Sequence, residues 1–316
     1  MFWLERIAIR DIKIFLRDLT SHFIYTLAII LISSAITYFF LSSLITQKLS
    51  TILPSTSAAL ILPSQKENLY TERGSPYDNR TIGSQSANVI FHGPRDKKKV
   101  ALTFDAEMTD GMKADLVSGA VKTSYNKKII DVLNQTNTKA TLFLTGLWIE
   151  LYPNETRELS GNSLIELGSH SYTDSSYYGF CYGLKQLDST LKIEDIGATE
   201  KLLREHAGIN NQLFRFPGGC YTPADVKLVN NAGDTVIHWD VAGADGFNNN
   251  TNQIVRNVVD NVQNGSIVVL HMNGAPTSPK TGEALPQIIL ELKAKGFEFV
   301  KISELIGLPS ETRVKF

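Results

Sequence analysis

The sequence predicts an α/β domain whose parallel strands form an irregular (β/α) barrel, preceded by one N-terminal transmembrane helix. From about residue 97 onward, short apolar runs alternate with amphipathic segments, as expected for parallel strands joined by helical crossovers. Ahead of that region, residues 23–45 form an uncharged and strongly apolar run. An open doubly wound sheet is the alternative architecture. No glycine-rich fingerprint follows the first strand, however, so a nucleotide-binding site has little support.

The apolar run 23–45 is long enough to cross a membrane, because a helix rises about 1.5 Å per residue and the bilayer core is about 30 Å thick. Four basic residues precede the run within segment 1–22, whereas one lysine follows it closely. This asymmetry predicts a cytoplasmic N-terminus, an anchor in the lipid bilayer and an extracytoplasmic remainder. A cleaved signal peptide is the alternative, but its apolar region would be shorter.

The rest of the chain divides by composition. Residues 46–96 are rich in Ser, Thr, Pro, Asn and Gln without a sustained period, which indicates a polar linker. Residues 97–309 carry the alternating pattern of the folded domain, and residues 310–316 form a short tail.

Composition and charge exclude several classes of protein. The 316 residues are 43% hydrophobic and 20% charged, which is ordinary for a folded chain. A formal net charge of −1 lacks the basic surplus of nucleic-acid-binding proteins, so we expect no nucleic-acid partner. Two cysteines, Cys181 and Cys220, are too few for a disulfide-rich scaffold or a cysteine-rich zinc site. They could pair if the domain is exported.

Polar and titratable residues stand where the predicted strands end. In a parallel barrel the carboxyl ends of all strands meet at one face, which is where active sites lie. One such residue is explained well by packing, but several together are costly to bury without a function. The strand-end residues are Asp105, His170, Arg215, Asp240, Asp245 and His271.

These residues belong to five short motifs in a fixed order. The motifs are Thr103-Phe104-Asp105-Ala106, His170-Ser171-Tyr172-Thr173-Asp174, Arg215-Phe216-Pro217-Gly218-Gly219-Cys220-Tyr221, Trp239-Asp240-Val241-Ala242-Gly243-Ala244-Asp245 and Val268-Val269-Leu270-His271. In this order they resemble the NodB-type polysaccharide deacetylases, which form family 4 of the carbohydrate esterases. The resemblance covers roughly residues 97–308 and implies a barrel of the NodB type.

The resemblance also implies a reaction, the metal-assisted removal of an acetyl group from an N-acetylated sugar. By position, Asp105 would be the general base and His271 the general acid. Arg215 would hold Asp105, and Asp245 would keep His271 protonated. The backbone N–H of Tyr221 or a neighbour would bind the developing oxyanion. Trp239 would line the floor of the cleft or belong to the core.

The metal site departs from the family pattern of one aspartate and two histidines. Ala106 stands at the aspartate position and cannot bind a metal, whereas Asp174 stands at the second histidine position and can. His170 and Asp174 suit a divalent metal such as zinc, with cobalt or nickel as alternatives. The third ligand is Glu107, Asp110 or Asp105, and Glu107 requires the chain to turn directly after Asp105.

Three functions stay open from the sequence. The first is a membrane-anchored deacetylase of an extracytoplasmic glycan, such as peptidoglycan, a chitin-like polymer or a glucosamine polymer. The second is a catalytically degenerate domain that binds glycan or a cell-envelope partner, which the loss of a carboxylate at Ala106 favours. The third is a hydrolase of the same fold with another substrate. An aromatic cluster after His170 is either a sugar-stacking wall or loop packing; its members are Tyr172, Tyr177, Tyr178, Phe180 and Tyr182.

Overall fold

The computed structural model describes residues 89–309 and 312–313. The basic segment 1–22, the expected transmembrane helix 23–45 and residues 46–88 of the linker lie outside the described residues. Within the described part of the chain, every helix is too short or too polar to cross a membrane.

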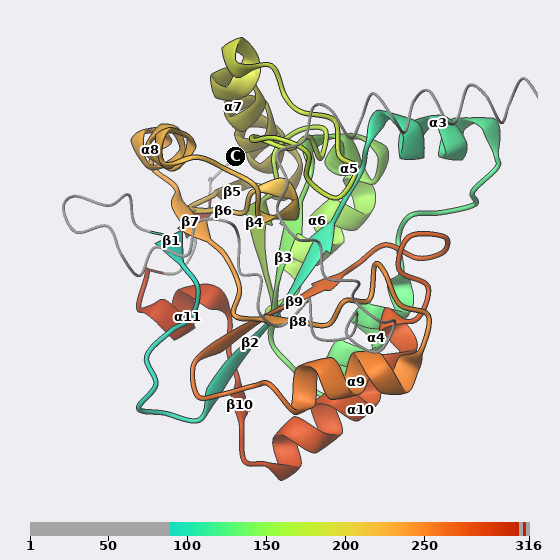
Figure 1. Cartoon of the computed structure of the whole chain (residues 1–316), viewed down its shortest axis with the longest axis vertical. Coiled ribbons are helices and arrows are strands. Elements are labelled where there is room, and N and C mark those ends of the chain that lie inside the picture. Colours follow the sequence, from blue (N-terminus) through green and yellow to red (C-terminus); the bar gives the residue numbers. More distant parts are fainter. Residues whose placement is uncertain (1–88, 310–311, 314–316) are drawn as a thin grey trace, which may run out of the picture. The chain divides into compact units, whose positions relative to one another are not determined.

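A parallel sheet forms the centre of the domain (Figure 1). Strand β2 lies in the middle, with β3 on one side and β9 on the other. The order across the sheet is β1-β7-β6-β4-β3-β2-β9-β8, and β10 pairs with the start of β2. The bounds are β1 Val89–Ile90, β2 Lys99–Ala106, β3 Ala140–Leu144, β4 Ile165–Ser169, β6 Leu213–Phe214, β7 Thr235–Ile237, β8 Val241–Ala242, β9 Ser266–His271 and β10 Glu298–Phe299.

The sheet is a parallel half-barrel, which confirms the α/β class and the parallel strands. The apolar run 236–241 does not form one strand, because the structure divides it between β7 and β8. Strand β7 pairs with β6, whereas β8 pairs with β9 at the other end of the order. The split occurs where the Asp240 side chain accepts hydrogen bonds from the Ile267 backbone N–H and from Arg95. These contacts join residues far apart in the sequence, so no local pattern predicted them.

Alternate residues of β2 face opposite sides of the sheet, as strand geometry requires. Leu102, Phe104 and Ala106 are fully buried in the main core beneath the helices. Thr103 and Asp105 alternate with them and are buried on the other side, where the candidate site lies. On β2, the buried polar residues thus lie on the face that carries the site.

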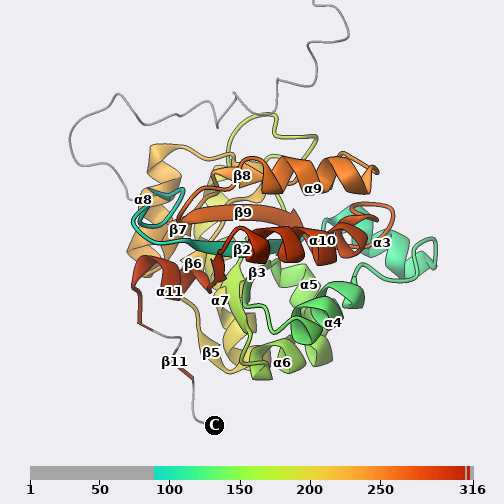
Figure 2. The same cartoon turned by 90° about the horizontal axis from the view of Figure 1, so that it is seen from below.

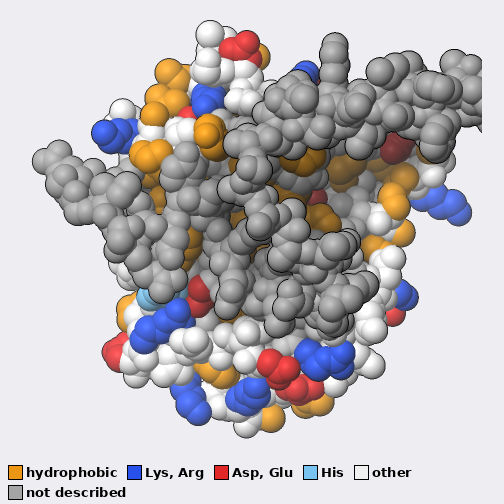
Figure 3. All heavy atoms as spheres, viewed as in Figure 1, with side chains coloured by type: hydrophobic (Ala, Val, Ile, Leu, Met, Phe, Trp, Pro, Cys, Tyr) orange, Lys and Arg blue, Asp and Glu red, His pale blue; other side chains and the backbone are white. Residues whose placement is uncertain are grey.

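Helices cover the outer side of the sheet, and α9 lies against α10 in both views (Figures 1 and 2). Helix α4 shows why such segments pack there, because its apolar residues recur on one face and are buried. Basic and acidic side chains are interspersed on the part of the face in Figure 3 that is not grey. The helices are α3 Asp110–Ser118, α4 Lys127–Gln135, α5 Gly146–Leu151, α6 Pro153–Gly161, α7 Lys192–Leu202, α8 Pro223–Ala232, α9 Thr251–Val259, α10 Thr281–Ala294 and α11 Ile302–Ile306.

The ends of the domain differ from the expected boundaries. Residues 89–91, which were expected in the linker, contact the domain, because β1 pairs with β7 and the Phe91 ring packs on His238 at 4.6 Å between centroids. At the other end, β11 (Thr312–Arg313) pairs antiparallel with β5 (Ile209–Asn210). These two residues were expected in the tail.

Candidate active site

Strand register brings most of the predicted strand-end residues to one place, whereas Asp240 pairs with Arg95 near the start of β9. In the ladders around β2, Asp105 is the direct partner of His271 on β9 and of Phe143 on β3. Ser169 on β4 pairs with Phe214 on β6, so the next residues, His170 and Arg215, leave the sheet side by side.

Arg215 is fully buried and contacts Asp105. Its Nη1 donates to Asp105 Oδ1 at 2.7 Å and to Thr103 Oγ1 at 2.7 Å. A buried guanidinium is costly to desolvate, and the carboxylate, the hydroxyl and the Phe143 ring beneath it at 4.0 Å offset that cost. The arrangement keeps Asp105 in one orientation with its Oδ2 free of Arg215.

The same guanidinium also reaches the interruption between β7 and β8. Its Nε lies 3.5 Å from the Ile237 carbonyl oxygen, and its Nη2 lies 3.4 Å from the His238 carbonyl oxygen. Arg215 therefore joins the broken segment of the sheet to the central strand β2.

His170 is fully buried, and its two ring nitrogens differ in their surroundings. Nδ1 lies 2.9 Å from the Arg215 carbonyl oxygen, so it carries the proton and donates. Nε2 then holds a lone pair, and it has no hydrogen-bond partner among the described residues. Burial lowers the pKa of His170, and the Asp105 and Glu107 carboxylates oppose that shift without reversing it. The ring is a neutral donor suited to a metal.

Asp174 presents an unpartnered carboxylate oxygen to the same space. Its Oδ1 lies 3.7 Å from His170 Nε2 and, within the described chain, accepts no hydrogen bond. The residue adopts a left-handed backbone conformation with a φ of 53°, which turns its side chain back toward the strand end. Burial raises the pKa of Asp174 well above its ordinary value, with Glu107 and Asp105 adding to the shift. A cation would relieve this unfavourable burial.

Glu107 completes a candidate metal site. Ligand atoms of Glu107, His170 and Asp174 all lie within 4.8 Å of one another. Of the three sequence candidates for the third ligand, Asp110 instead begins α3, and Asp105 pairs with Arg215. Glu107 reaches the site because β2 ends at Ala106, the residue before it. Two orphaned ligand atoms and a third carboxylate fit a divalent metal ion.

Asn273 fixes the backbone on both sides of the Glu107 residue. Its Oδ1 accepts from the Glu107 N–H at 3.1 Å, and its Nδ2 donates to the Glu107 carbonyl at 2.8 Å. Sequence reasoning missed Asn273, and the only signal was its position two residues after His271.

His271 has carboxylates at both ring nitrogens. Nδ1 lies 2.8 Å from Asp245 Oδ1, and Nε2 lies 3.2 Å from Glu107 Oε1. Burial alone would lower the pKa of His271, but Glu107 and Asp245 outweigh it and raise the pKa well above its ordinary value. Burial would likewise raise the pKa of Asp245, but contact with His271 lowers it. The pair is therefore an imidazolium held by a carboxylate.

Asp245 is itself held in place. Its Oδ2 accepts from the His271 backbone N–H at 2.8 Å and from Thr281 Oγ1 at 2.5 Å. Sequence reasoning missed Thr281, because the contact joins the first residue of α10 to a loop 36 residues earlier.

The two residues predicted for substrate contact lie in an aromatic layer beside Arg215. Tyr221 is buried with its ring stacked on Phe216 at 4.8 Å, and Trp239 is half-buried with its ring 5.6 Å from the Arg215 guanidinium carbon. His238 stacks on Trp239 at 4.1 Å, and burial lowers its pKa to about 4. We did not single out His238, because it lies inside an apolar run.

The aromatic cluster after His170 divides into buried and exposed members. Tyr177 is fully buried and donates to Asp195 at 2.6 Å, and Tyr172 donates to Glu150 at 2.8 Å. Tyr178, Phe180 and Tyr182 are exposed. Loop packing thus explains the first two, and only the last three remain as surface rings.

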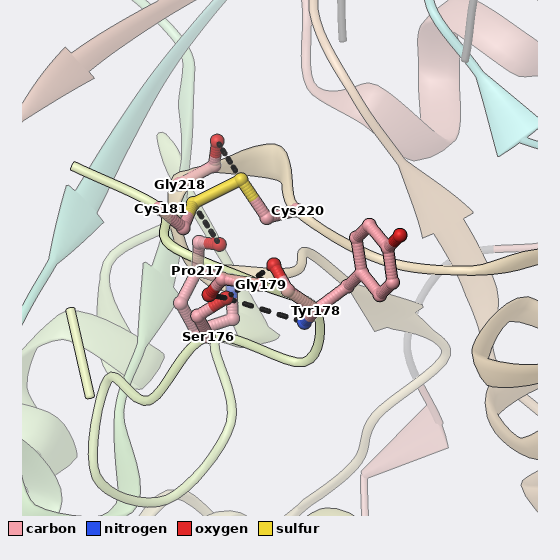
Figure 4. The surroundings of a disulfide bond; sticks show 7 residues. All are labelled: Ser176, Tyr178, Gly179, Cys181, Pro217, Gly218 and Cys220. Atoms are coloured by element: carbon pink, nitrogen blue, oxygen red, sulfur yellow. Dashed lines mark hydrogen bonds between the residues drawn. A yellow bond between two sulfur atoms is a disulfide. The ribbon is translucent and has the colours of Figure 1, made fainter. Parts of the chain in front are cut away.

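A disulfide ties this loop to the segment that follows Arg215. Cys181 and Cys220 are bonded, with 6.2 Å between their Cα atoms (Figure 4). The bond joins residues 39 positions apart and links the loop after β4 to the loop after β6.

A candidate divalent-metal site, a carboxylate held by a guanidinium and a protonated histidine thus lie together at the carboxyl ends of parallel strands. This combination is typical of metal-dependent hydrolases.

Comparison with known proteins gives the family. Residues 92–237 match the sequence profile of the polysaccharide deacetylases. Two proteins of Bacillus cereus named peptidoglycan-N-acetylglucosamine deacetylase are similar over 223 residues. One is 28% identical, covering 71% of this chain and 74% of the relative. The other is 30% identical, covering 69% of this chain and 92% of the relative. The chain belongs to the polysaccharide deacetylases, the NodB-type carbohydrate esterases of family 4.

Solved structures share the fold. A peptidoglycan N-acetylglucosamine deacetylase, Bc1960, crystallised with a naphthalenyl N-oxidanyl-benzamide, is 26% identical with a TM-score of 0.61, covering 73% of this chain and 96% of that chain. A Bacillus anthracis pseudoenzyme of carbohydrate esterase family 4 is 24% identical with a TM-score of 0.58, covering 70% and 69% of the two chains. That likeness shows the fold alone.

Proposed function

We propose that this protein removes N-acetyl groups from an extracytoplasmic polysaccharide in a metal-dependent hydrolysis. One observation carries the proposal: His170 Nε2 and Asp174 Oδ1, which have no hydrogen-bond partner among the described residues, lie with Glu107 in one cluster, and His271 contacts Glu107 and Asp245 beside it. The two Bacillus cereus relatives are named for peptidoglycan N-acetylglucosamine, which supports peptidoglycan or a related N-acetylated glycan as the substrate class.

Glu107, His170 and Asp174 would hold the metal, which we propose to be zinc, with cobalt or nickel as alternatives. When bound, such an ion polarises a carbonyl and lowers the pKa of a water molecule. The donor set of two carboxylates and one imidazole is harder than a site with two imidazoles. It therefore tolerates manganese better than such a site would.

Proton transfer would be divided between two residues. Asp105, fixed by Arg215, accepts a proton from the attacking water through its free Oδ2. His271, kept protonated by Asp245, donates a proton to the departing amine nitrogen. The acetyl group leaves as acetate, and the sugar keeps a free amino group. The backbone N–H of Tyr221 would bind the oxyanion, and Trp239 would line the cleft beside Arg215.

We propose an extracytoplasmic, membrane-anchored location for this activity. Residues 23–45 have the length and apolar composition of a bilayer anchor, and the basic residues precede them. The Cys181–Cys220 disulfide supports an oxidising compartment, since cytosolic thiols are normally kept reduced.

A catalytically degenerate glycan-binding domain is the second candidate. Ala106 favours it, because the family places a metal-binding carboxylate there, and one structural neighbour is a pseudoenzyme of the same esterase family. The Glu107 carboxylate at the metal cluster favours the deacetylase instead.

The test uses the full chain, purified with and without added zinc, cobalt or manganese. Bound metal is measured by mass spectrometry, and acetate release is measured from N-acetylglucosamine oligomers and from peptidoglycan. We expect about one metal per chain and metal-dependent release, both absent from metal-stripped protein. Asp105→Asn, which keeps the side-chain shape, should retain the metal and lose the activity. A folded chain that binds no metal and releases no acetate would leave the glycan-binding candidate.

A further inference from the structure

Two exposed aromatic rings from distant loops lie against each other beside the candidate active site. Tyr182 and Phe247 have ring centroids 5.4 Å apart with an interplanar angle of 40°. Each side chain is 61% exposed, although large aromatic residues are normally buried. The pair therefore presents an ordered apolar surface to solvent.

Tyr182 is held rigidly on the side of the site that carries Arg215. It follows Cys181, which is bonded to Cys220, and its backbone adopts a left-handed conformation with a φ of 51°. A Cβ atom on Gly218 would lie 3.2 Å from the Tyr182 ring and 2.4 Å from Cys181 Sγ. Only glycine at position 218 lets this loop approach so closely (Figure 4 shows Gly218 beside the disulfide).

Phe247 comes from the side that carries His271. Its backbone N–H donates to the Ala244 carbonyl at 3.2 Å, closing a tight turn that contains Asp245. A Cβ on Gly246 would lie 3.4 Å from His271 Cε1, so the residue before Phe247 touches the proposed acid. The aromatic pair thus bridges the two loops that flank the reacting groups.

A shallow polar pocket continues from Phe247. It has a volume of about 660 Å³ and is lined by Asn248, Asn249, Asn250, Thr251, Asn252 and Lys280. Asn248 and Asn250 use their side-chain oxygens inside the turn, as acceptors from the N–H groups of Asn250 and Gln253. Within the described part of the chain, no residue accepts a hydrogen bond from their NH₂ groups. Lys280 precedes Thr281, which holds Asp245, so the pocket borders the support of His271.

This combination matches the chemistry of a sugar ring. A pyranose has an apolar face of C–H groups that stacks on aromatic rings, and an equatorial rim of hydroxyls that pairs with amides. We propose that Tyr182 and Phe247, with the amide pocket of residues 248–252, bind a saccharide unit of the substrate chain next to the unit that is deacetylated. This inference rests on the proposed function, because it assigns a neighbouring subsite to the same glycan.

The test compares the binding of a short and a long ligand by the full chain. Calorimetry with the N-acetylglucosamine dimer and pentamer measures how much affinity the longer ligand gains. Phe247→Ala and Tyr182→Ala should each reduce that gain about tenfold, in line with one lost aromatic contact. Asn248→Ala should reduce it about threefold, in line with one lost hydrogen bond. Phe247→Trp should retain it.

Phe180→Ala is the matched control. Phe180 lies in the same disulfide-held loop and is 91% exposed, but it is not part of the stacked pair. Its removal should leave unchanged the gain in affinity from the dimer to the pentamer. The proposed subsite would be refuted if Phe180→Ala and Phe247→Ala reduced the affinity gain equally. It would also be refuted if Phe247→Ala, with an unchanged melting temperature, did not reduce the gain.

Failure of the subsite and failure of the proposed function give different results. A wild-type chain that binds the pentamer more tightly than the dimer, but releases no acetate, would refute the deacetylase and keep the subsite. A wild-type chain that releases acetate and binds both ligands equally would refute the subsite and keep the deacetylase.

Discussion

His170 and His271 leave the sheet on opposite sides of β2, and their surroundings give them opposite properties. His170 donates one nitrogen to a backbone carbonyl and leaves the other unpartnered among the described residues, and burial lowers its pKa. His271 has a carboxylate at each nitrogen, and its pKa is raised. Neighbouring groups with pKa values pushed apart divide a reaction between them. One ring is suited to hold a metal, and the other is suited to hold a proton.

The largest expected effect comes from removing each histidine in turn. His170→Ala should abolish metal binding and, with it, acetate release. His271→Ala should lower kcat by about 10²–10⁴-fold while the metal stays bound, because only a general acid is lost. Metal content by mass spectrometry and acetate release separate the two.

His206→Ala is the control for these variants, since His206 lies away from the site on the π-helical segment Leu203–Ala207. It should change neither quantity. Equal loss of metal in the His170 and His271 variants would break the division of roles.

A smaller effect is expected at Glu107, which belongs to the metal cluster with His170 and also contacts His271. Glu107→Gln should weaken metal affinity about 10–100-fold, because a charged ligand becomes a neutral one. Titration with zinc and a competing chelator measures this change. Asp110→Asn, at the rejected ligand candidate, should leave the affinity unchanged. The opposite ranking would move the third ligand from Glu107 to Asp110.

A still smaller effect is expected at Thr281, which acts only through Asp245. Thr281→Val removes the 2.5 Å hydrogen bond to Asp245 and nearly preserves the side-chain shape. We expect kcat to fall about 5–20-fold, in line with one hydrogen bond to a charged group, with metal content unaltered. Thr277→Val, in the loop that precedes α10, is the matched control. A Thr281→Val enzyme with normal kcat would show that Asp245 needs no such support.

The smallest expected effect concerns stability and lies outside the site. Burial raises the pKa of Asp234 to about 8, and contact with Glu200 adds to the shift. An unfolded aspartate has a pKa near 3.9, so between about pH 4 and pH 8 the folded chain keeps a proton that the unfolded chain has released. Stability should therefore fall as the pH rises through that window.

Asp234→Asn should flatten this dependence, as measured by thermal unfolding at pH 5 and pH 8. Asp260→Asn, at the end of α9, should leave the pH dependence of stability unchanged. The Asp234→Asn variant also helps to test the roles of His170 and His271, because it separates the pH dependence of folding from the pH dependence of catalysis. An unchanged slope in Asp234→Asn would assign the pH dependence of stability elsewhere.

The sequence predicted what local pattern and strand order determine. Alternating runs gave the parallel α/β class, and strand ends gave Asp105, His170, Arg215 and His271 before any geometry was known. Glu107 can reach the cluster only because β2 ends at Ala106. A sequence pattern does not locate the end of a strand to one residue, so the sequence left three candidates for the third ligand.

Other residues were beyond sequence reasoning because their partners are remote. Asn273 contacts Glu107 across 166 positions, and Asp240 interrupts the strand by pairing with Arg95 across 145 positions. Neither contact leaves a periodic or local signal. Glu107, by contrast, was one of three third-ligand candidates named from the sequence, and the structure places it in the cluster with His170 and Asp174.

Arg215 has a consequence for how sites of this kind change over evolutionary time. Its guanidinium contacts the Ile237 and His238 carbonyl oxygens between β7 and β8 and the Thr103 hydroxyl on β2. A side chain thus connects two parts of the sheet that are not joined there by backbone hydrogen bonds. These contacts are made whether or not the chain is active, so an arginine and an aspartate at these two positions in a related sequence are not by themselves a sign of activity. His170 Nε2, by contrast, has no hydrogen-bond partner among the described residues, so a histidine at this position in a related sequence is the better sign of a metal site.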